Sequence, residues 1–394
     1  MAQATDEFAR EVDSWFRKHV PRDWRSTART MPAPAYRDFQ LAWLRKLNSH
    51  GFAAPSVPTE YGGGGYSVAQ QAVIHRAAAV HDAPAFDLFE VSLNHVPGTF
   101  LEAGDAQQRE RYIRAAIEGV VWCQGFSEPG AGSDLSALAT RAERASGGWR
   151  INGQKIWSSH AADAQHCLLL ARTDPSSRRT RGITYFVMDM GTNGVTVRPI
   201  PQIPGTSEFC HIFIDDVFVP DDNVIGGVGN GWQVAQSTLS AERGPMVLPA
   251  IERMEFALRT LRAASDADTA FDEHDASLAT LAARQAAVRS LALDSVDLID
   301  RGQDAAGLAS LIKVSFSELL QDLTGYAALT ESERTLLDAG SGNAMGYLSG
   351  YWATDWLMSW SATIAGGANE VQRNIIAERM LGLPRESRPE PVIR

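Results

Sequence analysis

Apolar residues in the first third of the chain recur at the spacing of amphipathic helices. The positions are Phe8, Val12, Trp15, Phe16 and Val20, followed by Leu41, Leu44 and Leu47. The same spacing predicts helices over 68–80 and 107–117. Asp105 is suited to cap the second of these, because its carboxylate accepts hydrogen bonds from the free N–H groups of a first turn. Residues 1–118 are therefore predicted to form a helical domain.

The pattern changes near Val120 to alternation of apolar and polar positions, with many β-branched residues. Strands are predicted over 122–126, 166–172, 182–190 and 208–219. Residues 149–157 are predicted to form a hairpin, because Asn152-Gly153 is the dipeptide that best tolerates the positive φ angles of a type I′ turn. Residues 119–231 are accordingly expected to fold as an antiparallel β-domain, either a small barrel or a sandwich.

Helical periodicity returns after Gly231 and continues through the rest of the chain. A long helix is expected over 232–261, interrupted where Pro245 and Pro249 remove backbone donors. Three more are expected over 278–299, 305–329 and 346–364. Four amphipathic helices are able to bury a core of their own. Residues 232–394 are thus predicted to form a four-helix bundle, which makes the whole chain an α+β protein of three domains.

The charge balance narrows the possible partners. The chain has 394 residues and a formal net charge of −11. Nucleic acids and anionic membrane surfaces both call for clustered Lys and Arg, and the sequence has no such cluster. No apolar run is long enough to span a bilayer. We therefore expect a protein that binds neither nucleic acid nor membrane.

The cysteines and the N-terminus indicate the compartment. Cys123, Cys167 and Cys210 are odd in number, scattered and without CxxC spacing, which favours neither disulfides nor a zinc site. The nine histidines show no spacing typical of metal ligands. The N-terminus is acidic and lacks the basic and apolar regions of a signal peptide. The predictions are a cytoplasmic location, three buried cysteines and no metal.

The segment Trp122–Asp134, WCQGFSEPGAGSD, carries the most distinctive chemistry. An apolar strand leads into a loop in which Pro129, Gly130 and Gly132 impose an irregular backbone. Glycine lets such a loop approach a flat or anionic group closely, and Ser127 and Ser133 each supply a hydroxyl. On local features alone, the segment is either a ligand-binding loop or an ordinary surface turn.

Three motifs in this chain resemble those of the acyl-CoA dehydrogenases. Residues 125–134, GFSEPGAGSD, resemble the flavin-binding signature, and Ile364–Pro384 resembles the C-terminal signature of that family. Between them, Lys155-Ile156-Trp157-Ser158-Ser159 resembles the tryptophan and hydroxyl strand that lies against the flavin. The resemblance implies an FAD-dependent oxidoreductase of fatty acid or lipid metabolism, with the same order of domains.

The resemblance also implies which residues bind ligands. The cofactor-binding positions are Gln124, Phe126, Ser127, Gly132, Ser133, Trp157, Ser159, Gly366, Gly367 and Glu370. The positions expected to contact substrate are Ser133, Arg243 and Gly366. Gly366 and Gly367 precede a helix expected to start near Asn369, where backbone amides attract phosphate.

The catalytic base is where the sequence departs from the commonest family pattern. Removing a poorly acidic α-proton requires a carboxylate, yet Gly366 stands where many relatives have glutamate. A subset of the family carries the base instead in a Glu-Arg pair on the first bundle helix. Glu242-Arg243 matches that pair, so Glu242 is the predicted base. Glu252 and Glu370 are weaker candidates.

A second departure concerns the cofactor diphosphate and the assembly. Many relatives use an Arg-x-x-Phe-Gly segment to reach the FAD diphosphate of a neighbouring subunit, whereas residues 266–275 here are acidic. Arg284 and Arg289 are possible substitutes. The resemblance implies a homo- or hetero-oligomer, dimer or tetramer, that passes electrons to an electron-transfer flavoprotein.

Two further hypotheses remain beside an acyl-CoA dehydrogenase with its own turnover. The chain could be a non-catalytic subunit that completes a heteromeric dehydrogenase. It could also be an oxygen-reactive relative, an oxidase or a flavin-dependent monooxygenase. Bleaching of a bound flavin by substrate separates the first hypothesis from catalysis, and peroxide formation identifies an oxidase.

Overall fold

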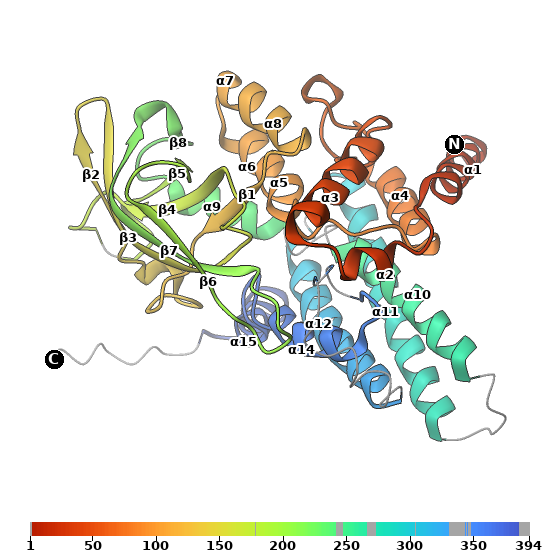
Figure 1. Ribbon diagram of the computed structural model, residues 1–394. Helices are drawn as coiled ribbons and strands as arrows, with labels where there is room; N and C mark the ends of the chain where they lie inside the picture. The colour runs from red at the N-terminus through yellow and green to blue at the C-terminus, as the bar shows by residue number, and fades with distance from the viewer. Residues whose placement is uncertain are drawn as a thin grey trace.

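The computed structural model places the helical N-terminal part, a sheet and a helical bundle in the order expected (Figure 1). The structure describes residues 2–177, 179–241, 247–265, 273–303, 305–330, 343, 345 and 348–385. In Figure 1 the sheet lies on one side of the molecule, with the N-terminal helices and the C-terminal bundle beside it. The protein is α+β, as predicted.

The N-terminal part is built from short helices around an aromatic core. They are α1 (Ala2–His19), α2 (Trp24–Arg29), α3 (Ala33–Asn48), α4 (Val68–Val80), α5 (Glu90–Asn94), α6 (Val96–Ala103), α7 (Ala106–Gln108), a π-helical turn (Arg109–Ile113) and α8 (Arg114–Ile117). The expected cap is confirmed, because the Asp105 carboxylate accepts from the Gln108 N–H at 2.8 Å. The helix predicted over 68–80 matches α4.

One eight-stranded sheet forms the middle of the chain. Its strands are β1 (Trp122–Gly125), β2 (Arg141–Ala145), β3 (Gly148–Ser159), β4 (His166–Arg172), β5 (Ile183–Asp189), β6 (Val195–Pro199), β7 (Phe209–Pro220) and β8 (Val224–Ile225). The order is β6-β7-β3-β2-β4-β5-β8, and β1 pairs with β4 off this path. The sheet is not purely antiparallel, since β1 pairs with β4 in parallel and β2 meets β4 in parallel at Arg141. The chain between β1 and β4 is long enough for the crossover that a parallel pair requires.

The hairpin predicted over 149–157 is wrong. Those residues lie within β3, which runs continuously and pairs with β2 and β7. The turn between β2 and β3 falls instead at Gly147, whose φ is 74°. Asn152-Gly153 forms an irregularity inside β3, where the Asn152 Oδ1 accepts from the Asp216 N–H at 2.9 Å. Gly153 has φ 154°, and a Cβ there would lie 2.7 Å from the Thr140 Cα, so this glycine serves a close contact and not a turn.

The C-terminal part is a helical bundle with its own core. Its helices are α9 (Gly231–Ala241), α10 (Leu248–Ser265), α11 (Glu273–Asp300), α12 (Ala306–Thr330), α14 (Trp352–Ala362) and α15 (Asn369–Ile375). The helix expected over 232–261, with an interruption near Pro245 and Pro249, is described as α9 and α10. Pro245 lies outside the described residues, and Pro249 lies in the first turn of α10, where a missing N–H costs nothing. The last predicted helix begins later than expected, at Trp352.

The sheet is buried on both faces. One face packs with the N-terminal helices and α9 in a core that includes Trp122, Phe126, Tyr185 and Val234. The opposite face holds Cys123, Cys167 and Cys210, all three free and buried as predicted. Burial raises the pKa of the Cys123 thiol, which keeps it protonated and unreactive.

Gly153→Ala tests the close contact inside β3. We expect the free energy of unfolding to fall by about 2–4 kcal/mol, because a methyl group meets the Thr140 backbone and φ is unfavourable for an L residue. Gly147→Ala, which also has positive φ but open space around it, should cost only about 1 kcal/mol. Chemical denaturation of both variants gives the comparison, and equal losses would show that the Thr140 contact is unimportant.

Candidate functional site

The loop after β1 is anchored on both sides. Phe126 is 5% exposed and packs edge to face against Tyr185, with ring centroids 5.6 Å apart. Glu128 and Ala131 exchange two backbone hydrogen bonds, both of 3.0 Å, which close the turn around Pro129 and Gly130. Gln124 lies half-buried on β1 opposite Leu168. The strand therefore delivers a rigid loop at the edge of the core.

The end of β3 lies directly beside this loop. The Ile156 N–H donates to the Ser127 carbonyl at 2.9 Å, and the Lys155 Nζ donates to the Phe126 carbonyl at 3.1 Å. Two motifs that are distant in sequence are thus joined by one main-chain and one side-chain hydrogen bond. Ile156, which precedes Trp157, is the residue that contacts Ser127.

Trp157 has an unusual backbone and an unusual exposure. Its φ is 62°, a left-handed conformation that costs an L residue about 1–2 kcal/mol. The regular pairing of β3 with β7 breaks between Lys155 and Ser158 at this point. The indole is 57% exposed and touches Phe209 only edge-on. Backbone strain that presents a large aromatic ring to the outside is typical of ligand-binding sites.

Three hydroxyls around the loop are available to a ligand. Within the described part of the chain, the side-chain hydroxyls of Ser127, Ser133 and Ser159 make no hydrogen bond. A Cβ added at Gly132 would meet nothing within 4 Å, so the space above the loop is open. An exposed indole, free hydroxyls and open backbone fit a flat heteroaromatic ring with polar edges, such as a flavin.

The C-terminal motif forms a second group at the start of α15. Gly366 and Gly367 have φ values of 64° and 92°. The Gln372 Nε2 donates to both of their carbonyls, at 3.1 and 3.4 Å, which holds the turn. Asn369 begins α15 as predicted, and Glu370 lies exposed in its first turn. Figure 1 shows α15 at the end of the bundle nearer the sheet.

Glu242 and Arg243, the predicted base and its neighbour, lie outside the described residues. The helix that leads to them, α9, contributes Val234 and Ala235 to the core that also contains Phe126. The Thr238 hydroxyl bonds the Thr99 hydroxyl at 2.8 Å and thereby ties α9 to α6. The last described turn of α9 is therefore anchored on the same core as the loop after β1.

Glu252 is a poor candidate for the base because two arginines hold its carboxylate. Its side chain is 2% exposed and accepts from Arg76 at 3.2 Å and from Arg289 at 2.7 Å. The same contacts occupy Arg289, and Arg284 pairs with Asp322 at 2.6 Å. Both possible substitutes for the missing diphosphate contact, Arg284 and Arg289, are therefore paired with acids of the same chain. Sequence reasoning missed these pairs because their members are far apart along the chain.

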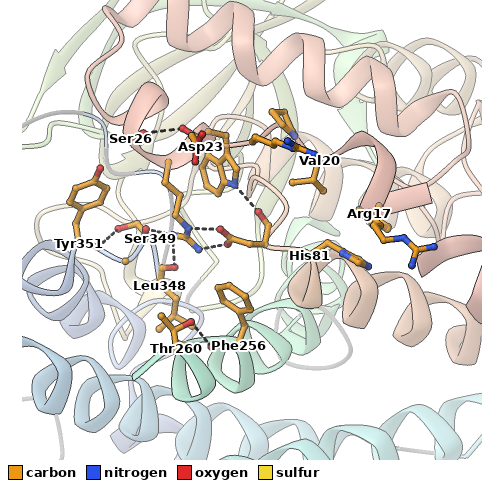
Figure 2. A pocket seen from close by; sticks show the side chains of 18 of the residues that line it. Arg17, Val20, Asp23, Ser26, His81, Phe256, Thr260, Leu348, Ser349 and Tyr351 are labelled. Carbon is orange, nitrogen blue, oxygen red and sulfur yellow. Dashed lines mark hydrogen bonds and ion pairs between the residues drawn. The ribbon is translucent and has the colours of Figure 1, made fainter. Parts of the chain in front are cut away.

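A separate hollow of about 680 Å³ lies between α1, α2 and α10. Figure 2 shows Arg17 and His81 on one side of it and Ser349 and Tyr351 on the other. Its wall is held by Arg25, which pairs with Asp82 and donates to the Leu348 carbonyl at 3.1 Å. Among the described residues, none that is predicted to bind cofactor or substrate lines it, so it is separate from the loop after β1.

Among the described residues, no group of three or more His, Cys, Asp or Glu side chains is arranged to hold a metal ion. No described helix is long and apolar enough to cross a bilayer.

Comparison with known proteins covers nearly the whole chain. The acyl-CoA dehydrogenase N-terminal, middle and C-terminal domain families match residues 3–120, 123–217 and 229–381. Acyl-CoA dehydrogenase IpdE1 of Mycobacterium tuberculosis is 34% identical over 408 residues, which cover 98% of this chain and all of the relative.

Solved structures agree with these matches. The Tcur3481-Tcur3483 steroid ACAD has a TM-score of 0.82 and 25% identity, with 98% of each chain covered. The ChsE4-ChsE5 complex of Mycobacterium tuberculosis has a TM-score of 0.80 and 26% identity, with 97% of this chain and 98% of the other covered. Together with the three domain matches, these similarities show that the chain belongs to the acyl-CoA dehydrogenase family of FAD-dependent oxidoreductases.

Proposed function

We propose that the chain oxidises an acyl-CoA thioester to its α,β-enoyl form with Glu242 as the base. The reaction removes a weakly acidic α-proton and a β-hydride, so it needs a carboxylate on one side of the acyl chain and a redox group on the other. FAD, when bound, supplies the hydride acceptor, because no side chain does. The residues of the chain take the proton and stabilise the charge that develops on the thioester oxygen.

The observation that carries the base assignment is the anchoring of α9. The contacts of Val234, Ala235 and Thr238 fix α9, which is described as far as Ala241, to the core beneath the loop after β1. Glu252 is held in two ion pairs and is a poor alternative. A carboxylate enclosed beside an acyl chain loses hydration, which raises its pKa and makes it a stronger proton acceptor.

The loop and the end of β3 would hold the flavin ring of FAD. Phe126 and Ser127 border the ring, Trp157 lies against it, and Ser159 donates to its polar edge. Gln124, Gly132 and Ser133 are the other proposed FAD contacts of this loop. The support is the free hydroxyls, the strained and exposed indole, and the open space at Gly132.

The turn before α15 would contact both ligands. Gly366 has no side chain to act as a base, but its N–H is suited to bond the thioester oxygen and stabilise the enolate. Gly367 and the first turn of α15, including Glu370, would lie against FAD. Ser133 and Arg243 are the other proposed substrate contacts.

A second candidate function is a subunit that works with another acyl-CoA dehydrogenase chain. Arg284 and Arg289 are both neutralised by acids of their own chain, so they are poor ligands for the FAD diphosphate of a neighbour. Residues 266–272 of the acidic segment lie outside the described ranges, but its composition also disfavours a diphosphate. A partner chain that provides the missing cation would resolve this, and ChsE4-ChsE5 is a structural relative described as a complex.

An apolar strip on the bundle supports such an assembly. Trp356 and Trp360 lie one turn apart on α14, and Ile364 follows at the same spacing. They are 40%, 54% and 69% exposed. Large apolar side chains grouped in this way are typical of protein interfaces. We propose that this strip is covered by a second chain, identical or related.

The acyl group is proposed to be bulky and polycyclic. The support is the similarity to the steroid ACAD over nearly the full chain. An electron-transfer flavoprotein remains the proposed acceptor. Peroxide release during turnover in air would instead favour the oxygen-reactive alternative.

Glu242→Gln tests the base. We expect the variant to bind FAD and keep its yellow spectrum, while the rate of anaerobic flavin bleaching by acyl-CoA falls about 10²–10⁴-fold, the usual contribution of a general base. Straight-chain and steroid-type acyl-CoAs are compared in the same stopped-flow assay. Glu118→Gln removes an exposed carboxylate of the N-terminal part and serves as the control. Equal bleaching by wild type and Glu242→Gln would refute the assignment.

Gly132→Ala tests the flavin loop. The methyl group meets no protein atom within 4 Å, so the unfolding temperature should be unchanged. It would fill space that the cofactor needs, and FAD affinity should fall about tenfold or more. Gly98→Ala, where a methyl group also meets open space, is the control. Fluorescence titration of FAD into apoprotein measures the affinity, and an unchanged value would place the cofactor elsewhere.

Trp360→Glu tests the interface. A charge in the strip should dissociate the assembly by at least tenfold in Kd, because a buried unpaired charge is costly. Analytical ultracentrifugation gives the oligomeric state. Ile299→Glu adds the same charge at an exposed apolar position on α11 and should leave the assembly intact. If Trp360→Glu also leaves it intact, the strip is not the interface.

A further inference from the structure

The loop that carries Ser127 rests on a buried ion pair. The Lys155 Nζ lies 2.8 Å from the Glu128 Oε1, and the two side chains are 0% and 7% exposed. Lys155 belongs to β3 and Glu128 to the loop after β1, 27 residues away. Burial of two opposite charges beside a proposed ligand site calls for an explanation, because apolar residues of similar size would usually stabilise a core as well or better.

The pair makes hydrogen bonds at both ends of the loop. Lys155 also donates to the Phe126 carbonyl at 3.1 Å, one residue before Ser127. The Glu128 carboxylate accepts from the Ala139 N–H at 2.7 Å and from the Thr140 N–H at 2.9 Å. The Glu128 carboxylate therefore connects the loop after β1 with Lys155 of β3 and with the backbone of Ala139 and Thr140.

The same residues determine where Trp157 lies. Lys155 is the last regularly paired residue of β3 before the strand breaks, and Trp157 follows two residues later in its strained conformation. Between them, Ile156 donates to the Ser127 carbonyl at 2.9 Å. Movement of Lys155 would shift Ser127 and Trp157 together.

The charges of the pair depend on one another. Burial lowers the pKa of Lys155, and the Glu128 carboxylate opposes this effect. Burial raises the pKa of Glu128, but Lys155 and the backbone N–H donors outweigh it, so the net pKa is lowered. The other titratable group that acts on Lys155 is the Cys167 thiol of β4. Loss of either partner leaves the other charge buried with insufficient compensation.

We propose that Lys155 and Glu128 are positioning residues that hold Ser127 and Trp157 in the geometry that FAD requires. The proposal rests on the proposed flavin site and adds two residues that do not themselves contact the ring. It explains why a charged pair occupies this place, since an apolar pair would leave the Phe126 carbonyl and two N–H groups without partners.

The test compares Glu128→Gln, Lys155→Met and the double variant. Two quantities are measured between pH 5.5 and 9.5: FAD dissociation, and hydrogen exchange of the peptide that covers 126–134. Each single variant should bind FAD about tenfold or more weakly and exchange faster in this loop, because one partner of a buried pair is lost. Neither measurement needs turnover, so both can be read whether or not Glu242 is the base.

The two single variants should depend on pH in opposite directions. In Glu128→Gln the pKa of Lys155 falls further below its value in the unfolded chain. The loss of loop stability relative to wild type, measured as faster hydrogen exchange and weaker FAD binding, therefore grows as pH decreases from about 10. In Lys155→Met the pKa of Glu128 rises above its value in the unfolded chain. The same loss of loop stability therefore grows as pH increases from about 4.5. The double variant has neither charge and should show little pH dependence.

Glu252→Gln is the matched control, because it removes another buried and paired carboxylate, on α10. It should lower the unfolding temperature without faster exchange over 126–134. The proposal is overturned if the Glu128 and Lys155 variants lose thermal stability while loop exchange and FAD dissociation stay as in wild type. It is also overturned if their losses do not vary with pH, which would indicate packing alone.

Discussion

An ammonium group without water around it must be neutralised where it lies, and Lys155 is fully buried. Its only carboxylate partner among the described residues is Glu128, so β3 and the loop after β1 have to fold against each other. The other contacts of the loop follow from this constraint: the Phe126 carbonyl meets the ammonium group, and the Ser127 carbonyl meets the next N–H of β3. A loop rich in glycine is thus fixed in one conformation by its hydrogen bonds to β3.

That strand also supports the strain at Trp157. A left-handed tryptophan persists only where its neighbours determine the backbone on both sides. Here β3 pairs with β2 and β7 before the irregularity and with β7 again after it. The backbone that carries the exposed indole is therefore held by the sheet, and the ring itself contacts Phe209 edge to face. A site built in this way keeps its shape before any ligand arrives, which lowers the entropy cost of binding.

The sequence predicted most of the fold because its signals were local. Helical periodicity located α4 and α11, and the apolar run Cys167–Ala171 located β4 to the residue. Asn152-Gly153 predicted a turn that does not form, since the close approach of Thr140 depends on tertiary packing that a dipeptide does not reveal. The site was predicted in part for the same reason. Ser127 and Trp157 stand in recognisable motifs, but neither the Lys155–Glu128 pair nor the strain at Trp157 has a sequence signal.

The pair that occupies Arg289 has a consequence for how the chain folds. Arg76 on α4, Arg289 on α11 and two acids of α10, Glu252 and Glu255, form a cluster in which each guanidinium group pairs with both carboxylates. Its members come from the N-terminal helices and from the bundle, so neither part alone can compensate all of these charges. The three domains recognised in the sequence are therefore not expected to be independent units of stability. The bundle and the N-terminal helices should gain and lose their structure as one cooperative body.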